Sequence, residues 1–416
     1  MSEAHHKALQ PHALVPERSD ANEAVPRKTG RTRSFSGWWL GLIVVVELLV
    51  LFAVAELVAA WFLPPGHHYR YPQMLIEPNA RRTYYHRPNQ QAFTIDKPFV
   101  TNALGFRDER EVPAEKGAEF RILALGDSVT VGLGVAAEET YARQLEALLG
   151  RSIAPLRVIN AAVTCYSTWQ EVDVLKETAS AVRPDVVTLA FYWNDLYPKP
   201  EVIAPLADVH TVVAQDAAQQ YMRLFKRSRA LSFLRERWAS LSNSLWPTFD
   251  WAHRNVIYKG ESNPYLERAY EDVRASLEEF AALGREGFVP VLLLLPMPLQ
   301  VQQAEEPARH MQERIETIAA RAGLRVLDLL PALRRAYAQH RDLYIAWDYE
   351  HFTPRGHRVV AEALQRYLVD QRLVPAVQKA QQLASNDKSH HSFRSDMLAA
   401  SRFAHPPAAR RIRLRR

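Results

Sequence analysis

From Phe120 onward, short continuous apolar runs alternate with longer amphipathic segments. The five apolar runs cover residues 121–125, 156–163, 186–191, 289–295 and 324–329. Their apolar residues follow one another without polar alternation, which is typical of parallel strands that are covered on both faces. The segments with helical periodicity cover residues 137–149, 169–182, 264–285, 307–322 and 353–369. This order predicts an α/β fold over residues 120–373, a three-layer α/β/α sandwich around a parallel five-stranded sheet.

Polar residues follow two of the predicted strands at the point where each strand ends. Gly126-Asp127-Ser128 comes after the first strand, and Asn194-Asp195 comes after the third. Since ligands bind at the carboxyl ends of parallel strands, these residues are candidates for a site. Ser128 is either a nucleophile or the N-cap of the next helix. A phosphate-binding loop is disfavoured because no lysine follows Gly132 or Gly134.

A second group of polar residues, DYEHFTPRGH, lies near the last predicted helix. Thr353-Pro354 is a favourable helix start, so His351 lies in the loop before it and Asp348 three residues earlier. At that spacing a carboxylate can hold one imidazole nitrogen and leave the other for a hydroxyl. A metal site built from Asp348, His351 and His357 is disfavoured, because the other strand ends carry no matching ligand cluster.

Two residues could stabilise an oxyanion at the same sheet edge. The amide of Asn194 could donate to an oxyanion, or the residue could form an Asx-turn that leaves the strand. The second strand is followed by INAAVTCYST, whose backbone could add an amide donor at Cys165. Cys165, the one cysteine of the chain, is itself either a nucleophile activated by His351 or a small packed residue.

Together these motifs resemble those of the SGNH hydrolases, also called GDSL esterases, over residues 120–373. The matching blocks are Gly126-Asp127-Ser128-Val129-Thr130, Asn194-Asp195 and Asp348-Tyr349-Glu350-His351. The resemblance implies a flavodoxin-like sheet and a catalytic triad of Ser128, His351 and Asp348. It also implies an oxyanion hole formed by the amides of Ser128 and Cys165 and the side chain of Asn194, with no metal or cofactor.

The chain departs from the family pattern at two positions. Cys165 and Tyr192 stand where the family usually has glycine. If residue 165 needs a positive φ, a side chain there costs about 1–2 kcal/mol. Both side chains are also expected to narrow the space for the acyl group.

The resemblance implies a serine esterase that acts on O-acyl, and specifically O-acetyl, esters of cell-envelope glycans. Two alternatives remain open. The same Ser-His-Asp site could transfer an acyl group to a polysaccharide, or the protein could be a non-catalytic glycan-binding or scaffold protein with an altered oxyanion hole.

The front of the chain contains an apolar segment at residues 38–63, which reads WWLGLIVVVELLVLFAVAELVAAWFL. As a helix it would extend about 39 Å, enough to cross a bilayer. The cluster of Lys and Arg at residues 27–33 predicts a cytoplasmic N-terminus, which places the catalytic domain in the periplasm or outside the cell. A cleaved signal peptide is the alternative. Glu47 and Glu56 within the span either mark a membrane-protein partner or are protonated without a role.

The remaining segments complete the predicted organisation. Residues 1–37 form a disordered lead, 64–119 a membrane-proximal segment, and 196–262 an insertion that is either a lid or a membrane-surface helix. The net charge of +6 is concentrated in a disordered tail at residues 374–416, which ends in ARRIRLRR. Because the rest of the chain is nearly neutral, no basic face for nucleic acid is expected. The expected partners are the membrane and an acylated carbohydrate or other small ester.

Overall fold

The structure is a computed structural model. It describes residues 37–65, 69–201, 227–246, 248–303, 305–306, 308–346, 348 and 350–375. The predicted N-terminal lead, the basic tail beyond residue 375 and much of the insertion lie outside the described residues. By its internal contacts the chain divides into two units, Met1–Val54 and Ala55–Arg416.

The second unit is built around one parallel sheet of five strands in the order β6-β5-β7-β8-β9. The strands are β5 (Phe120–Leu125), β6 (Leu156–Asn160), β7 (Val186–Phe191), β8 (Val289–Leu294) and β9 (Arg325–Asp328). All six residues of β7 are buried, as expected for a central strand covered on both faces. The order reverses beside β5, which is the topological switch point of a doubly wound fold. The predicted sheet is confirmed.

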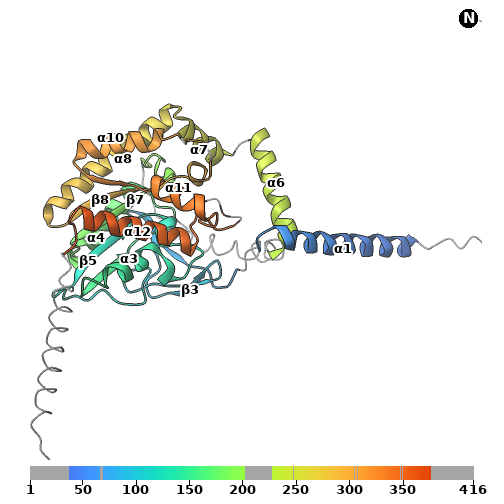
Figure 1. Ribbon diagram of the computed structural model, residues 1–416, viewed down its shortest axis with the longest axis horizontal. Coiled ribbons are helices and arrows are strands. Elements are labelled where there is room, and N and C mark those ends of the chain that lie inside the picture. Colours follow the sequence, from blue (N-terminus) through green and yellow to red (C-terminus); the bar gives the residue numbers. More distant parts are fainter. Residues whose placement is uncertain are drawn as a thin grey trace, which may run out of the picture. The chain divides into compact units, whose positions relative to one another are not determined.

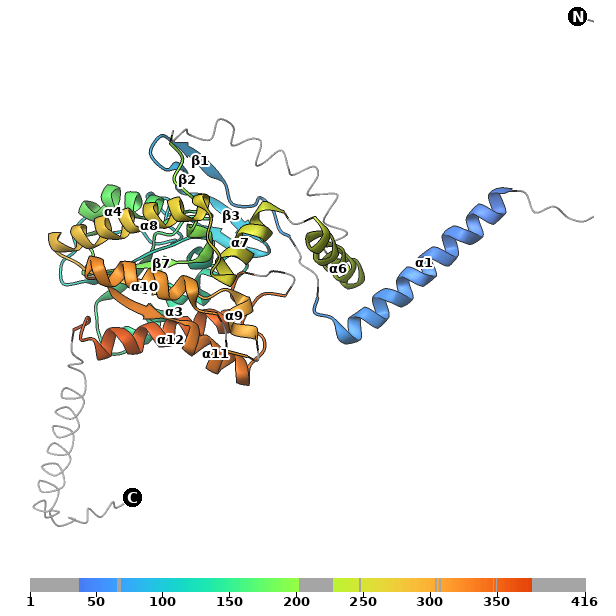
Figure 2. The ribbon, with the colours of Figure 1, turned by 90° about the horizontal axis from the view of Figure 1, so that it is seen from above.

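Helices cover both faces of this sheet (Figures 1 and 2). On one face α3 packs against α12, and on the other α8 packs against both α4 and α10. Their bounds are α3 (Tyr141–Leu149), α4 (Thr168–Val182), α8 (Pro264–Leu283), α10 (His310–Ala322) and α12 (Pro354–Asp370). The helix predicted at residues 137–149 is instead a 3₁₀ turn at Ala137–Glu139 followed by α3. Thr140 separates the two with an extended backbone, and its hydroxyl accepts from Arg143 N to start the helix.

Several elements were not predicted from the sequence. The shorter helices α9 (Pro298–Gln302) and α11 (Leu330–Gln339) lie beside each other. Two hairpins precede the sheet, β1 (Ile76–Asn79) with β2 (Thr83–His86) and β3 (Gln91–Thr94) with β4 (Lys97–Val100). Gly105 closes the following turn at φ 75°, and a Cβ there would lie 2.6 Å from the carbonyl oxygen of His86. Glycine is therefore required at this position.

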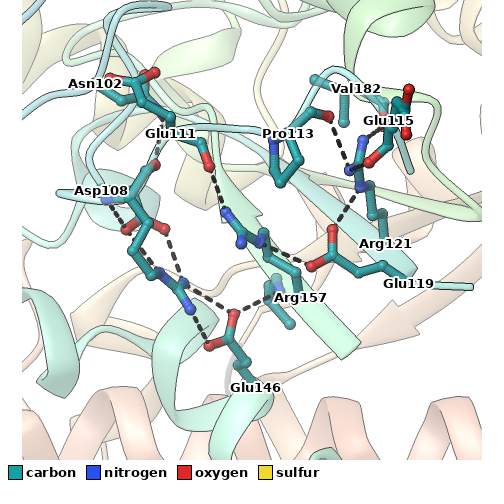
Figure 3. Close-up of polar contacts among 12 residues, drawn as sticks. Asn102, Asp108, Glu111, Pro113, Glu115, Glu119, Arg121, Glu146, Arg157 and Val182 are labelled. Carbon is teal, nitrogen blue, oxygen red and sulfur yellow. Dashed lines mark hydrogen bonds and ion pairs between the residues drawn. The ribbon is translucent and has the colours of Figure 1, made fainter. Parts of the chain in front are cut away.

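The segment before β5 is bonded to the start of the sheet by arginines (Figure 3). The guanidinium of Arg121 is fully buried, and it donates to Glu119 at 2.7 Å and to the carbonyl oxygen of Val182 at 2.8 Å. Arg157, in β6, donates to Glu119 at 3.2 Å and to the carbonyl oxygen of Glu111 at 2.7 Å. A buried charge needs such a complete set of partners. The predicted domain boundary at residue 120 thus falls inside a bonded network, and it stays a prediction.

The N-terminal helix α1 (Gly37–Phe62) has 26 residues and contains an 18-residue stretch with a mean hydropathy of 2.8, so it is long and apolar enough to cross a membrane. Its last two turns belong to the second unit. There the Glu56 carboxylate accepts from the Ser228 hydroxyl at 2.6 Å and from the amide of Arg229 at 2.8 Å. Glu56 is therefore bonded within the chain, while a protein partner at Glu47 stays a prediction.

The described part of the insertion forms two helices, α6 (Arg229–Leu245) and α7 (Phe249–Lys259). In the sequence, Tyr221, Leu224, Leu231, Leu234, Trp238 and Leu241 fall at helical spacing, and the part of this stretch from Leu231 onward lies in α6. Tyr221 and Leu224 lie outside the described residues.

Candidate active site

Ser128 lies directly beyond the carboxyl end of β5, at the first position of the short helix α2 (Ser128–Val131). The N-cap of this helix is Asp127, whose carboxylate accepts from Val129 N at 2.9 Å. The capping role considered for Ser128 thus belongs to its neighbour. A Cβ on Gly126 would lie 2.1 Å from the Thr130 hydroxyl, so only glycine allows the chain to turn this tightly from strand to helix.

The loop before α12 brings His351 to Ser128. The Nε2 atom of His351 lies 2.9 Å from Ser128 Oγ, and its Nδ1 lies 2.8 Å from Asp348 Oδ2. The other carboxylate oxygen of Asp348 accepts from the amides of Glu350 at 2.9 Å and His351 at 3.0 Å. Thr353 caps α12 as predicted, with its hydroxyl accepting from the Gly356 amide at 3.2 Å. The three predicted triad residues form one hydrogen-bonded chain, in which Ser128 and His351 are 223 positions apart in sequence.

The hydrogen bond between Asp348 and His351 shifts the pKa of both groups. Burial acts to raise the pKa of Asp348, but the hydrogen bond and charge of His351 outweigh it and leave the pKa below its usual value. Burial likewise acts to lower the pKa of His351, and the hydrogen bond and charge of Asp348 outweigh it and raise the pKa. The imidazolium is therefore stabilised, which favours removal of a proton from a hydroxyl that contacts Nε2.

Asn194 follows β7 in the 3₁₀ turn Trp193–Asp195. Its Nδ2 donates to Asp127 Oδ2 at 2.8 Å, which brings the side chain to the N-terminus of α2. Asp195, rather than Asn194, closes the turn out of the strand, since its carboxylate accepts from Tyr192 N at 2.6 Å. Burial raises the pKa of Asp127, and the hydrogen bond from Asn194 partly offsets this effect.

Cys165 has a left-handed backbone with φ 59°, the conformation that glycine adopts most easily. Its side chain lines a pocket and is exposed there. Partial burial of the thiol by the surrounding residues, together with the negative charges of Asp127 and Glu350, raises the pKa of Cys165 to about 11. A thiol of this pKa stays protonated near neutral pH and is a poor nucleophile. Nε2 of His351 is also engaged by Ser128. The geometry thus favours Ser128 over Cys165 as the attacking group.

The loop that carries Cys165 is held by residues that sequence reasoning missed. The Tyr84 hydroxyl donates to the carbonyl oxygen of Thr164 at 2.7 Å, and His86 Nε2 lies 3.2 Å from the Thr164 hydroxyl. Burial lowers the pKa of His86 to about 3, so the ring is neutral. Both residues come from β2, a strand in the predicted membrane-proximal segment, and their sequence carried no signal of this contact.

Sequence reasoning also missed Arg107, which follows the turn at Gly105. Its guanidinium is buried and donates to the carbonyl oxygens of Val131 at 2.7 Å, Val135 at 2.6 Å and Pro98 at 3.2 Å. Burial lowers its pKa to about 10, so the group keeps its charge at neutral pH. A cation at the carbonyl end of a helix satisfies groups that the helix leaves unpaired. Arg107 therefore fixes the far end of α2, the helix that begins with Ser128.

A pocket of about 490 Å³ opens beside these residues and is lined by strand-end residues and by the insertion. Its lining consists of Cys165, Ser167, Trp193, Asn194, Tyr197, Asn243, Thr248, Asp250, Trp251, Arg254 and Glu350. Ser128 is not part of this lining, so the pocket meets the site at Cys165 and Asn194. The Arg254 guanidinium lies 5.0 Å from the centre of the Trp251 ring and 3.9 Å from Glu350. The insertion thus supplies one wall of the pocket.

A sequence model of the GDSL-like lipase/acylhydrolase family matches residues 124–359, a range that includes the three predicted triad residues. The chain belongs to this family. Its fold is the family's sandwich with a five-stranded parallel sheet, and the protein is a hydrolase that acts on ester bonds.

Solved structures of similar fold share little sequence with this chain. TesA is 14% identical, with 61% of this chain and 99% of TesA covered and a TM-score of 0.37. The acetyl xylan esterase AlAXEase is 12% identical, with 60% of this chain and 100% of AlAXEase covered and a TM-score of 0.38. Axe2, an acetylxylan esterase from Geobacillus stearothermophilus, is 16% identical, with 59% of this chain and 93% of Axe2 covered and a TM-score of 0.34. No curated protein matches the sequence.

Proposed function

We propose that this esterase is a serine enzyme in which Ser128 is the nucleophile, His351 the general base and Asp348 the group that orients it. The observation that carries the proposal is the hydrogen-bonded chain from Ser128 Oγ to His351 at 2.9 Å and on to Asp348 at 2.8 Å. In this order the imidazole can accept the hydroxyl proton while the carboxylate stabilises the cation that forms.

In the proposed reaction, Ser128 Oγ attacks the ester carbonyl and His351 Nε2 takes its proton. The amides of Ser128 and Cys165 and the Nδ2 group of Asn194 donate to the oxyanion. The tetrahedral intermediate then expels the alcohol, which receives the proton from His351 and leaves an acyl group on Ser128. Water, deprotonated by the same imidazole, hydrolyses this acyl-enzyme and regenerates the hydroxyl.

The pocket supports a short acyl group on a carbohydrate. The Cys165 side chain lines the pocket, and buried Tyr192 lies two residues before Asn194, so these two side chains are the proposed limit on the length of the acyl group. The lining of the pocket also includes the aromatic residues Trp193 and Trp251 and the polar residue Asp250. Aromatic faces interspersed with a few polar groups suit a sugar ring, which has apolar faces and hydroxyl edges. An O-acetyl ester of a glycan is therefore the proposed substrate class.

We also propose that α1 anchors the enzyme with its N-terminus in the cytoplasm and the catalytic domain in the periplasm or outside the cell. The basic residues before the helix support this orientation. The contacts of Glu56 with Ser228 and Arg229 support an uncleaved helix, because cleavage after the apolar segment would remove them from the folded unit.

The test compares the full-length protein in detergent with its Ser128→Ala variant. We expect the wild type to release nitrophenol from nitrophenyl acetate and to react with a fluorophosphonate. The variant should lose the label and turn over at least about 10⁴-fold more slowly. Equal turnover by both proteins would refute the serine mechanism.

A second assay uses an acetylated oligosaccharide with and without an unacetylated acceptor. Free acetate in both cases supports hydrolysis, and acetylated acceptor would assign the site to acyl transfer. A folded wild type that binds the oligosaccharide without releasing or transferring acetate would favour the non-catalytic alternative.

A further inference from the structure

Helix α6 exposes a stripe of apolar residues, while two of its polar residues are buried. Leu234, Trp238, Leu241 and Leu245 follow one another at intervals of four, three and four positions, so they form one stripe along the helix. Their exposed fractions are 59%, 71%, 53% and 57%, whereas Ser232 and Glu236 of the same helix are buried. A helix on the surface of a soluble domain has the opposite arrangement, because exposed apolar area is unfavourable in water.

The start of α6 is bonded to the end of α1. The Glu56 carboxylate accepts from the Ser228 hydroxyl and from the amides of Arg229 and Ala230, at 2.6, 2.8 and 3.1 Å. The Arg229 guanidinium donates back to the carbonyl oxygens of Ala60 at 2.7 Å and Leu63 at 3.0 Å. The first turn of α6 is thus joined to the point where the apolar helix α1 ends.

The side chains that border the apolar stripe suit a lipid surface. Arg235 and Arg237 are exposed on either side of buried Glu236, and the Arg237 guanidinium lies 5.3 Å from the centre of the Phe233 ring. Trp246 is 76% exposed at the end of the helix. Basic residues beside an apolar face, with tryptophan at the level of the lipid headgroups, characterise helices that lie in the plane of a membrane.

We propose that α6 lies in the surface of the bilayer that α1 crosses, with its apolar stripe in contact with lipid. The proposal rests on the proposed anchoring of the enzyme by α1. The 17 residues of α6 extend about 26 Å from the end of α1, and Asn243 in its last turn lines the pocket. The mouth of the pocket is therefore held next to the membrane, where an ester carried at the bilayer surface reaches it.

The test measures the contact of α6 with lipid in the full chain reconstituted in phosphatidylcholine and phosphatidylglycerol vesicles. Cys165→Gly removes the native thiol, and Leu241→Cys or Leu245→Cys then carries an environment-sensitive fluorophore. The matched control is Arg274→Cys, an exposed position on α8, a helix of the catalytic domain. Thermal unfolding of each labelled variant checks that it is folded.

We expect the probes at Leu241 and Leu245 to be blue-shifted and strongly quenched by lipids that carry a nitroxide near the headgroup, while the probe at Arg274 is not. Unquenched probes on α6 in folded protein would overturn the proposal, because water, a second copy of the chain or another segment would then cover the stripe. This readout does not require turnover, so failure of the proposed esterase mechanism leaves it intact. Protection of α1 from protease in the same vesicles separates a failure of α6 from a failure of the anchor.

Discussion

Replacement of Cys165 by glycine tests whether the altered oxyanion loop is strained. Cys165 has φ 59°, a conformation in which a side chain costs about 1–2 kcal/mol. Glycine removes this strain, but it also increases the conformational entropy of the unfolded chain, which lowers the stability of the folded protein by about 0.4–1 kcal/mol. Because the side chain is exposed to the pocket, little apolar burial is lost. We therefore expect Cys165→Gly to raise the free energy of unfolding by about 0–1.6 kcal/mol, the difference between these two ranges.

Cys165→Ala is the matched control, since alanine keeps the Cβ and its strain and removes only the sulfur. Chemical denaturation of both variants gives the comparison, and about 1 kcal/mol corresponds to a shift in Tm of about 2–4 °C for a domain of this size. Glycine should exceed alanine in stability. A glycine variant less stable than the alanine variant would refute strain at this position.

The same variants report on the acyl pocket. If the thiol limits the acyl group, both Cys165→Gly and Cys165→Ala should raise the ratio of kcat/KM for hexanoyl over acetyl nitrophenyl esters. An unchanged ratio would place the limit elsewhere, with Tyr192 as the next residue to replace.

Three further outcomes follow from the site. Because the pKa of His351 is raised, kcat/KM for a soluble ester should fall as the pH decreases through a value above 6.5, and a limb below 6.5 would contradict the pairing with Asp348. Asp348→Asn should lower kcat by about 10⁴-fold. The same variant should also be less stable than the wild type, most of all between about pH 4 and 6.5. The lowered pKa of Asp348 stabilises the folded protein above the carboxyl pKa of the unfolded chain, and the raised pKa of His351 stabilises it below the imidazole pKa of the unfolded chain. Chemical denaturation at a series of pH values measures this window. Arg107→Gln should lower the free energy of unfolding by about 3 kcal/mol and reduce kcat, because the buried carbonyl oxygens of Val131 and Val135 lose their donor. Arg110→Gln, which removes a partly exposed ion pair, should lower it by about 1 kcal/mol or less in the same unfolding assay.

The strands of the sheet and the start of its last helix could be predicted from the sequence. The continuous apolar runs predicted all five strands because a strand buried on both faces leaves no place for polar alternation. The start of α12 was predicted because a threonine hydroxyl and a proline at the first helical position act within one turn. The candidate site residues could be chosen because the carboxyl ends of parallel strands converge on one edge of the sheet.

What the sequence could not indicate depends on contacts between distant residues. Arg107 holds carbonyl groups 24 and 28 positions away, Tyr84 reaches the loop of Cys165 across 80 positions, and Glu56 binds the start of α6 across 172. No periodicity or cap marks these residues, because the partner that gives each one its role lies on another element. Local propensity and strand-end position thus determined the sheet and the choice of Ser128, Asp348 and His351. Only the tertiary structure decided the supports of the site and the outward apolar face of α6, because burial and hydrogen bonding at those residues are set by packing between elements.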